Sequence, residues 1–302
     1  MATAAEPQPA SLPLPGGRKG ASVKLHPLLT GTVIAPPAYV YRETGRLGPL
    51  RALGIGVPRD RWLKLAVPAF LVEHPGVGNV LVDTGFHPSV GVDPKQNLGR
   101  LAATLFPKPE TEASQAVPAQ LRARGIEPSS VKVVVMTHLH FDHASGMSEF
   151  PDATFVFSTS EWEAATASRA QMNGYVARQF DHGFDYRLLD FESEEADSFA
   201  TFGRSLDLFG DGSVRTVFTP GHTHGHMSVI LKLRGREVLL AGDAIYTLRA
   251  LREGALPYLM ADSHHYRRSL KEIQLYERET PDTLVVASHD LDAWQKLEPV
   301  YE

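Results

Sequence analysis

Histidine and aspartate side chains crowd the segment that directly follows a short apolar run. Residues 131–137 predict a β-strand buried on both faces, and His138, His140, Asp142 and His143 come next. A spacing of two puts His138 and His140 on one side of an extended segment, and a bend turns Asp142 and His143 toward another point nearby. We therefore interpret the cluster as ligands for two metal ions rather than as histidines solvated in a loop.

Ligand-type side chains also follow three later predicted strands. These strands span residues 214–218, 238–241 and 284–287, and the residues just beyond them include His222, Asp243 and His289. Each one alone is a weak signal, because an aspartate after a strand is more often a turn residue and a histidine in a glycine-rich loop is usually solvated. Together with the first cluster they place five histidines and two aspartates at the carboxyl ends of strands, where open α/β sheets bind their ligands.

Composition narrows the chemistry further. The 302 residues contain no cysteine, which excludes a thiolate metal site, a disulfide framework and a cysteine nucleophile. Imidazole and carboxylate ligands suit zinc, and also cobalt, iron or manganese. The net charge of −5 argues against a nucleic acid partner, and no apolar run is long enough for a membrane span.

The elements that position these residues alternate between strand and helix. Besides the strands above, we expect strands at 23–29, 66–73, 80–83, 153–158 and 228–233, and helices at 159–170 and 264–278. Strands precede helices in each half, which suggests two sheets with outer helices. Residues 1–20 are rich in alanine and proline and predict a mobile tail rather than a signal peptide, with an arm packed on the body or on a second subunit as the alternative. Residues 21–302 would then form one domain of a cytoplasmic protein.

The combined pattern resembles the metallo-β-lactamase superfamily. The matching pieces are His138-x-His140-x-Asp142-His143, Thr-Pro-Gly-His222, Gly-Asp243, His289 and the early Leu-Val-Asp83-Thr-Gly. The block Thr-Pro-Gly-His-x-x-Gly-His and a tyrosine three residues after Asp243 are most similar to the N-acyl-homoserine lactonases. The resemblance implies an α/β fold, an αββα sandwich with a dinuclear metal site, and an enzyme that opens a small-molecule lactone.

Residue roles follow from this resemblance. His138, His140 and His222 would hold the first of two divalent ions, most simply zinc. Asp142, His143 and His289 would hold the second, and Asp243 would bridge the two. A hydroxide between the metals would attack the lactone carbonyl, Tyr246 would donate a hydrogen bond to the oxyanion, and Asp142 would pass a proton to the leaving oxygen. Asp83 either orients a histidine ligand or is a turn residue that caps Gly85.

Of the predicted site, the residues that would contact the substrate are the ones that the sequence determines least. An apolar stretch rich in proline and glycine contains Tyr39, Tyr41 and Trp62, and it would either line a groove for the acyl chain or form a homodimer contact. Hydrolysis of another lactone, a thioester or a phosphotriester on the same metals stays open. So does a metal-binding protein without enzymatic activity. A hydroxyacyl-glutathione thioesterase would need a C-terminal substrate domain, whereas only a short segment follows His289.

Overall fold

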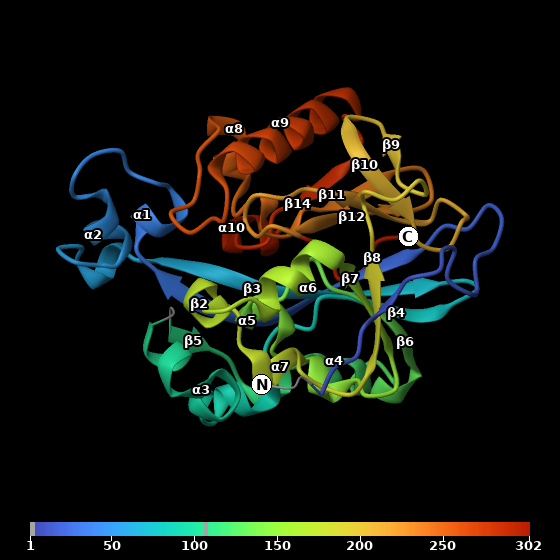
Figure 1. The fold of residues 1–302 in the computed structure, drawn as a ribbon, viewed down its shortest axis with the longest axis horizontal. Helices are drawn as coiled ribbons and strands as arrows, with labels where there is room; N and C mark the ends of the chain where they lie inside the picture. Colours follow the sequence, from blue (N-terminus) through green and yellow to red (C-terminus); the bar gives the residue numbers. More distant parts are fainter. Residues whose placement is uncertain (1–3, 106–107) are drawn as a thin grey trace.

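The structure, a computed structural model, describes residues 4–105 and 108–302. Within these ranges two β-sheets pack face to face, and helices cover the outer side of each sheet (Figure 1). The αββα sandwich expected from the sequence is therefore confirmed. None of the helices in the described ranges is long and apolar enough to cross a membrane.

The first sheet has the strand order β1-β8-β7-β6-β4-β3-β2-β5. Strands β4, β6, β7 and β8 run parallel, while β3, β2 and β5 continue the sheet in antiparallel fashion from β4. The strand bounds are β1 Gln8–Pro9, β2 Lys24–Ala35, β3 Leu63–His74, β4 Gly78–Val82, β5 Lys108–Glu110, β6 Val131–Val135, β7 Thr154–Ser158 and β8 Asp185–Leu189.

The second sheet has the order β14-β13-β12-β11-β10-β9. Strands β9 to β13 are antiparallel neighbours, and β14 joins β13 in parallel. The strand bounds are β9 Asp197–Phe199, β10 Phe202–Asp207, β11 Val214–Phe218, β12 Met227–Lys232, β13 Glu237–Leu240 and β14 Leu284–Val286.

Most of the α-helices are short, and the longest lies on the outside of the second sheet (Figure 1). The helix bounds are α1 Pro37–Val40, α2 Gly48–Ala52, α3 Pro94–Leu105, α4 Val117–Arg122, α5 Phe141–Ala144, α6 Thr159–Thr166, α7 Ala177–Phe180, α8 Leu248–Glu253, α9 Ser263–Glu279 and α10 Leu291–Trp294.

Strand alternation divides the apolar side chains between an inner and two outer cores. In β12, Val229 and Leu231 pack into the core between the sheets, whereas Ile230 faces helix α9. In β4, Val80 and Val82 point inward, and Leu81 packs on the opposite face of the first sheet. Because successive strand residues point to opposite faces, a strand covered on both sides is apolar throughout.

Strand direction brings the predicted ligands to one edge of the sandwich. Strands β4 and β6 are parallel, so Asp83 and the segment 138–143 leave the first sheet at the same end. In the second sheet β12 is antiparallel to both β11 and β13, and β14 is parallel to β13. The loops that carry His222, Asp243 and His289 therefore emerge together, as expected from their positions after strands.

Expected and observed elements agree closely where the pattern is strong. Strand 214–218 is observed with the same bounds, and helix 264–278 extends by one residue at each end. The helix expected at 159–170 ends at Thr166, because Ala167 is already extended and Arg169 is left-handed. Its N-cap is Ser158, whose hydroxyl accepts the N–H of Glu161 at 3.0 Å.

The part of the N-terminal segment that the structure describes contacts the body, which agrees with the alternative of a packed arm, while the mobile tail stays a prediction. Strand β1 pairs with β8, and the Leu14 N–H donates to the carbonyl of Leu208 at 2.7 Å. The Leu14 side chain is buried in the core between the sheets. The prolines argued against a signal peptide, but they could not show that Ala5 and Leu14 pack against apolar side chains of the body.

Because the Leu14 side chain is buried in the core, shortening it should lower the stability of the protein. Leu14→Ala should lower the free energy of unfolding by about 2 kcal/mol, the lower end of the range for a buried leucine because Leu14 lies near the surface. Urea unfolding followed by circular dichroism measures it, with the exposed Lys19→Ala as control. Equal midpoints for both variants and the parent protein would contradict a packed arm.

Candidate metal centre

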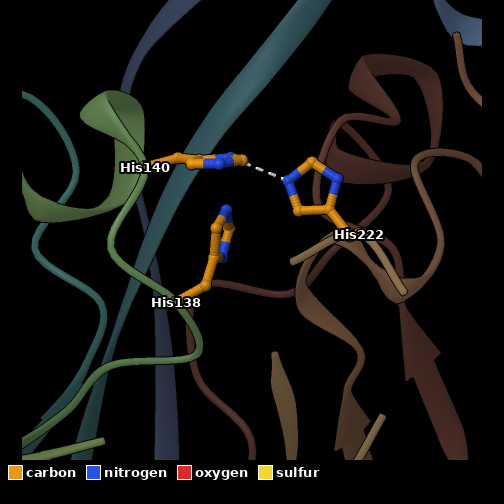
Figure 2. A group of neighbouring side chains, drawn as sticks. All are labelled: His138, His140 and His222. Atoms are coloured by element: carbon orange, nitrogen blue, oxygen red, sulfur yellow. Dashed lines mark hydrogen bonds between the residues drawn. The ribbon is translucent and has the colours of Figure 1, made fainter. Parts of the chain in front are cut away.

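Three histidines from two loops converge at the edge of the sandwich. His138 and His140 follow β6, and His222 follows β11. Their rings lie 4.7 to 4.8 Å apart, centroid to centroid, and His222 Nε2 is 2.8 Å from His140 Nδ1 (Figure 2). The three side chains are buried, and one nitrogen of each lies within 4.8 Å of the others. The geometry therefore suits a single ion held by three imidazoles.

A second group shares the same edge. Asp142, His143 and His289 offer ligand atoms within 4.8 Å of one another, and so do His138, His143 and Asp243. Asp243 lies between the two sets: its Oδ2 is 3.2 Å from both His222 Nε2 and His289 Nε2, and its Oδ1 is 3.3 Å from His143 Nε2. This is the position a bridging carboxylate would need. The structure thus brings all seven sequence-predicted ligands together.

Three of these buried atoms have no hydrogen-bond partner among the residues that the structure describes. They are His138 Nε2, His143 Nε2 and Asp243 Oδ1. A buried polar atom without a partner is rare because its desolvation is not compensated. Lone pairs of nitrogen and oxygen that face one another are explained by a bound cation. The donor set, imidazole and carboxylate without sulfur, fits divalent metal ions.

Burial also favours the protonation states that bind metal. Desolvation lowers the pKa of His140 to about 3 and holds the pKa values of His138 and His222 well below the usual range. These imidazoles are therefore neutral, which is the form that binds a metal. Burial opposes ionisation of Asp243, yet His289, His222 and His143 lower the pKa of its carboxyl well below the ordinary value. The bridge position is thus an anion.

Asp83 holds one of the predicted ligands in place. Its Oδ2 accepts a hydrogen bond from His143 Nδ1 at 2.8 Å, and its two oxygens also accept from the backbone N–H and hydroxyl of Thr137. This contact leaves His143 Nε2 free to face Asp243. Asp83 has a φ of +57°, a conformation uncommon outside glycine and frequent at functional sites. Of the two sequence interpretations, the orienting role agrees with these contacts.

The loops after β11, β13 and β14 are held in place by hydrogen bonds and by close contacts between backbones. His226 is buried, and its Nε2 accepts the N–H of Asp243 at 2.9 Å. Gly221, with a φ of +133°, lets the loop touch helix α9, since a Cβ there would lie 2.2 Å from the backbone nitrogen of Tyr266. His289 Nδ1 donates to the carbonyl of Ala66 at 2.8 Å, which directs its Nε2 toward Asp243.

Tyr246 lies over the histidines with its hydroxyl 3.5 Å from His222 Nδ1. Its ring is 4.8 Å from that of His289 and is buried. Desolvation raises the pKa of Tyr246 well above its ordinary value, so the hydroxyl keeps its proton at neutral pH. A protonated hydroxyl beside the ligand cluster is able to donate a hydrogen bond to a bound oxyanion.

The three aromatic residues predicted as a substrate wall separate into two places. Tyr39 packs beside Tyr246, with ring centroids 6.4 Å apart. Tyr41 and Trp62 instead line a cavity of about 800 Å³. The lining of this cavity includes His289, so it adjoins the ligand cluster. Its wall also contains Leu63, Leu65, Val286 and Trp294.

Glu161 connects the loops that carry the ligands, and the sequence alone did not indicate this role. Glu161 is acidic and lies in the first turn of α6, where a carboxylate is expected to interact with the helix end. In the structure it is fully buried and accepts the N–H of Leu139 at 2.8 Å and the hydroxyl of Thr223 at 2.6 Å. One signal in the sequence is its place just after the predicted strand 153–158. In the structure this strand, β7, pairs with β6, which precedes the histidine cluster.

Comparison with known proteins agrees with this geometry. The chain is 34% identical over 242 residues to an N-acyl homoserine lactonase AttM of Rhizobium radiobacter, which covers 79% of this chain and 87% of that protein. It is 31% identical over 273 residues to a probable metallo-hydrolase of Mycobacterium tuberculosis, covering 86% and 83% of the two chains.

A solved structure shares the fold. An N-acyl homoserine lactone hydrolase with the product N-hexanoyl-L-homoserine at its catalytic metal centre superposes with a TM-score of 0.71 and 22% identity, over 92% of this chain and 97% of that one. The family model of the metallo-β-lactamase superfamily matches residues 63–289, which include all seven predicted ligands. The chain belongs to the metallo-β-lactamase superfamily.

Proposed function

We propose that the protein is a hydrolase that opens the lactone ring of N-acyl homoserine lactones, with two divalent ions, most simply zinc. One observation carries the proposal: seven buried histidines and aspartates form two adjoining ligand groups, with the Tyr246 hydroxyl beside them. The identity to N-acyl homoserine lactonases supports the substrate class. Since these lactones are bacterial quorum signals, the activity amounts to quorum quenching.

The proposed metal sites divide the ligands as the sequence suggested. His138, His140 and His222 would hold one ion, Asp142, His143 and His289 the other, and Asp243 both. Ions bound there supply an acidified water molecule as nucleophile and polarise the substrate carbonyl. Asp83, through His143, fixes the direction from which the second ion is held.

Tyr246 supplies the hydrogen bond to the oxygen that gains charge. With His222 Nε2 facing the ligand cluster, His222 Nδ1 carries the ring proton and points to the Tyr246 hydroxyl. Tyr246 thus accepts at its oxygen and keeps its own proton for the substrate. A donor placed where charge develops stabilises the transition state more than the ground state.

Asp142 is positioned to move a proton. Its Oδ2 lies 3.7 Å from His289 Nε2 and 3.9 Å from His143 Nε2, within the second ligand group. Burial raises the pKa of the Asp142 carboxyl. In the proposal, Asp142 takes a proton from the attacking water and passes it to the ring oxygen as the bond to the carbonyl carbon breaks, so the ring oxygen becomes the alcohol of the opened product.

The acyl chain of the substrate would lie in the cavity lined by Tyr41 and Trp62. The apolar part of its wall suits an alkyl chain, and its lining includes His289, one of the proposed ligands. Tyr39 would instead contact the ring end, because its ring packs beside that of Tyr246. The homodimer contact and the cytoplasmic location expected from the sequence stay predictions.

Loss of a ligand should abolish activity together with metal binding. Asp243→Asn or His138→Ala is expected to release metal and lower kcat/KM by more than 100-fold, since even changes behind the ligands cost ~10–100-fold. Metal analysis and ring-opening assays on the same samples measure this. The exposed His264→Ala provides the control. A variant without metal that hydrolyses the lactone normally would contradict the metal assignment.

Tyr246→Phe separates the hydroxyl from the metals. The ring and its packing survive, so metal content should stay unchanged, while kcat on lactones falls by about 100-fold or somewhat less because a metal shares the oxyanion charge. An aryl ester with a good phenolate leaving group should be less affected. Unchanged kcat on lactones at full metal content would make Tyr246 a packing residue.

The two aromatic positions should differ in their dependence on chain length. Trp62→Ala should raise KM more for long-chain than for short-chain lactones, because each buried CH₂ contributes ~0.8 kcal/mol. Tyr39→Leu should affect all chain lengths alike. Steady-state kinetics across one homologous series measures both. If Trp62→Ala affects all lengths equally, the dimer contact is the better interpretation of this wall.

A further inference from the structure

Glu161 is an acidic side chain in the protein interior, and none of the ion pairs among the described residues includes it. Its exposed fraction is 0%, and it lies in the first turn of α6 behind the histidine cluster. Burial of an ionised carboxylate is costly unless hydrogen bonds compensate it. The groups that bond to Glu161 therefore indicate what it does.

The first bonded group belongs to the loop after β6. Glu161 Oε1 accepts the backbone N–H of Leu139 at 2.8 Å. Leu139 is the residue between His138 and His140, so this one bond fixes the backbone from which both imidazoles extend.

The second set belongs to the loop after β11. Glu161 Oε2 accepts the hydroxyl of Thr223, the residue after His222, at 2.6 Å. Gly225 packs so closely that a Cβ would lie 2.0 Å from the Glu161 nitrogen. The N-cap Ser158 holds the same loop by donating to the Gly225 carbonyl at 2.6 Å.

Tyr175 lies beside both Glu161 and His140. Its hydroxyl lowers the pKa of the Glu161 carboxyl against the effect of burial, and its ring lies 4.8 Å from the His140 ring. The backbones of His140 and Tyr175 also form an isolated β-bridge. Glu161 therefore bonds to Leu139, which lies between His138 and His140, and to Thr223, which lies next to His222.

We propose that Glu161 is the positioning residue of the three-histidine subsite, the carboxylate that sets the separation of His138 and His140 from His222. The inference rests on the proposed function, because it assumes that these histidines hold a metal ion. It predicts an effect on one subsite only. His143 and His289 are oriented by Asp83 and by the carbonyl of Ala66 instead.

A carboxylate is suited to this task and an amide is not. A carboxylate only accepts hydrogen bonds, whereas the side-chain amide of glutamine presents two N–H donors. The hydroxyl of Thr223 can rotate, but the backbone N–H of Leu139 cannot. Glu161→Gln keeps the size of the side chain and removes part of the acceptor capacity, so it loosens the loops without emptying the site.

Cobalt titration of the metal-free protein tests the proposal. The two subsites have different donor sets and give different d–d bands, which His140→Ala and His289→Ala assign. Glu161→Gln should weaken cobalt binding at the three-histidine subsite by ~10–100-fold and shift its band, while the other subsite changes by less than about 3-fold. The matched control is Glu237→Gln. Glu237 also accepts a hydrogen bond from a tyrosine hydroxyl, that of Tyr276, but it lies at the end of β13 that is remote from Asp243.

The milder Thr223→Val removes one of the bonds and should weaken the same subsite by about 3- to 10-fold. Wild-type affinities and bands in both Glu161→Gln and Thr223→Val would overturn the positioning role while leaving the proposed function intact. Equal weakening at both subsites would assign Glu161 to folding alone and also overturn it. Failure of the parent protein to bind cobalt would overturn the proposed function as well.

Discussion

Seven buried histidine and aspartate side chains face one another at one edge of the sandwich, and the rest of the structure keeps them there. Without a cation this arrangement is unfavourable, because His138 Nε2, His143 Nε2 and Asp243 Oδ1 lack hydrogen-bond partners among the described residues. The ligands come from four loops, so no single element positions them. The two sheets do, because their strand directions place those four loops at the same end.

Behind the ligands lies a layer of hydrogen bonds that decides where each imidazole points. Asp83 directs His143, the carbonyl of Ala66 directs His289, and Glu161 ties together the loops of the other three histidines. Glycines complete this layer where backbones touch, at Gly221 against α9 and at Gly225 against α6. The chemistry therefore depends on residues that would not touch the substrate.

The fold and the ligand cluster were predictable because both follow from local patterns. The apolar run before His138 specifies a buried strand, and ligand-type residues after strands 214–218, 238–241 and 284–287 must share an edge if the sheets are ordered as in this family. The role of Glu161 was not predictable, because its partners Leu139 and Thr223 are distant in sequence. Packing of Leu14 and the different surroundings of Tyr39 and Trp62 likewise depend on tertiary contacts that residue spacing does not encode.

The central claim is that two metal ions on these ligands open a lactone ring. The most direct measurement is the rate of N-acyl homoserine lactone hydrolysis as zinc is added back to metal-free protein, with bound metal counted in the same samples. The account predicts no turnover in the metal-free protein and a rate that rises until two ions are bound per chain. Full turnover without metal, or a protein that takes up two ions and leaves the lactone intact, would contradict it.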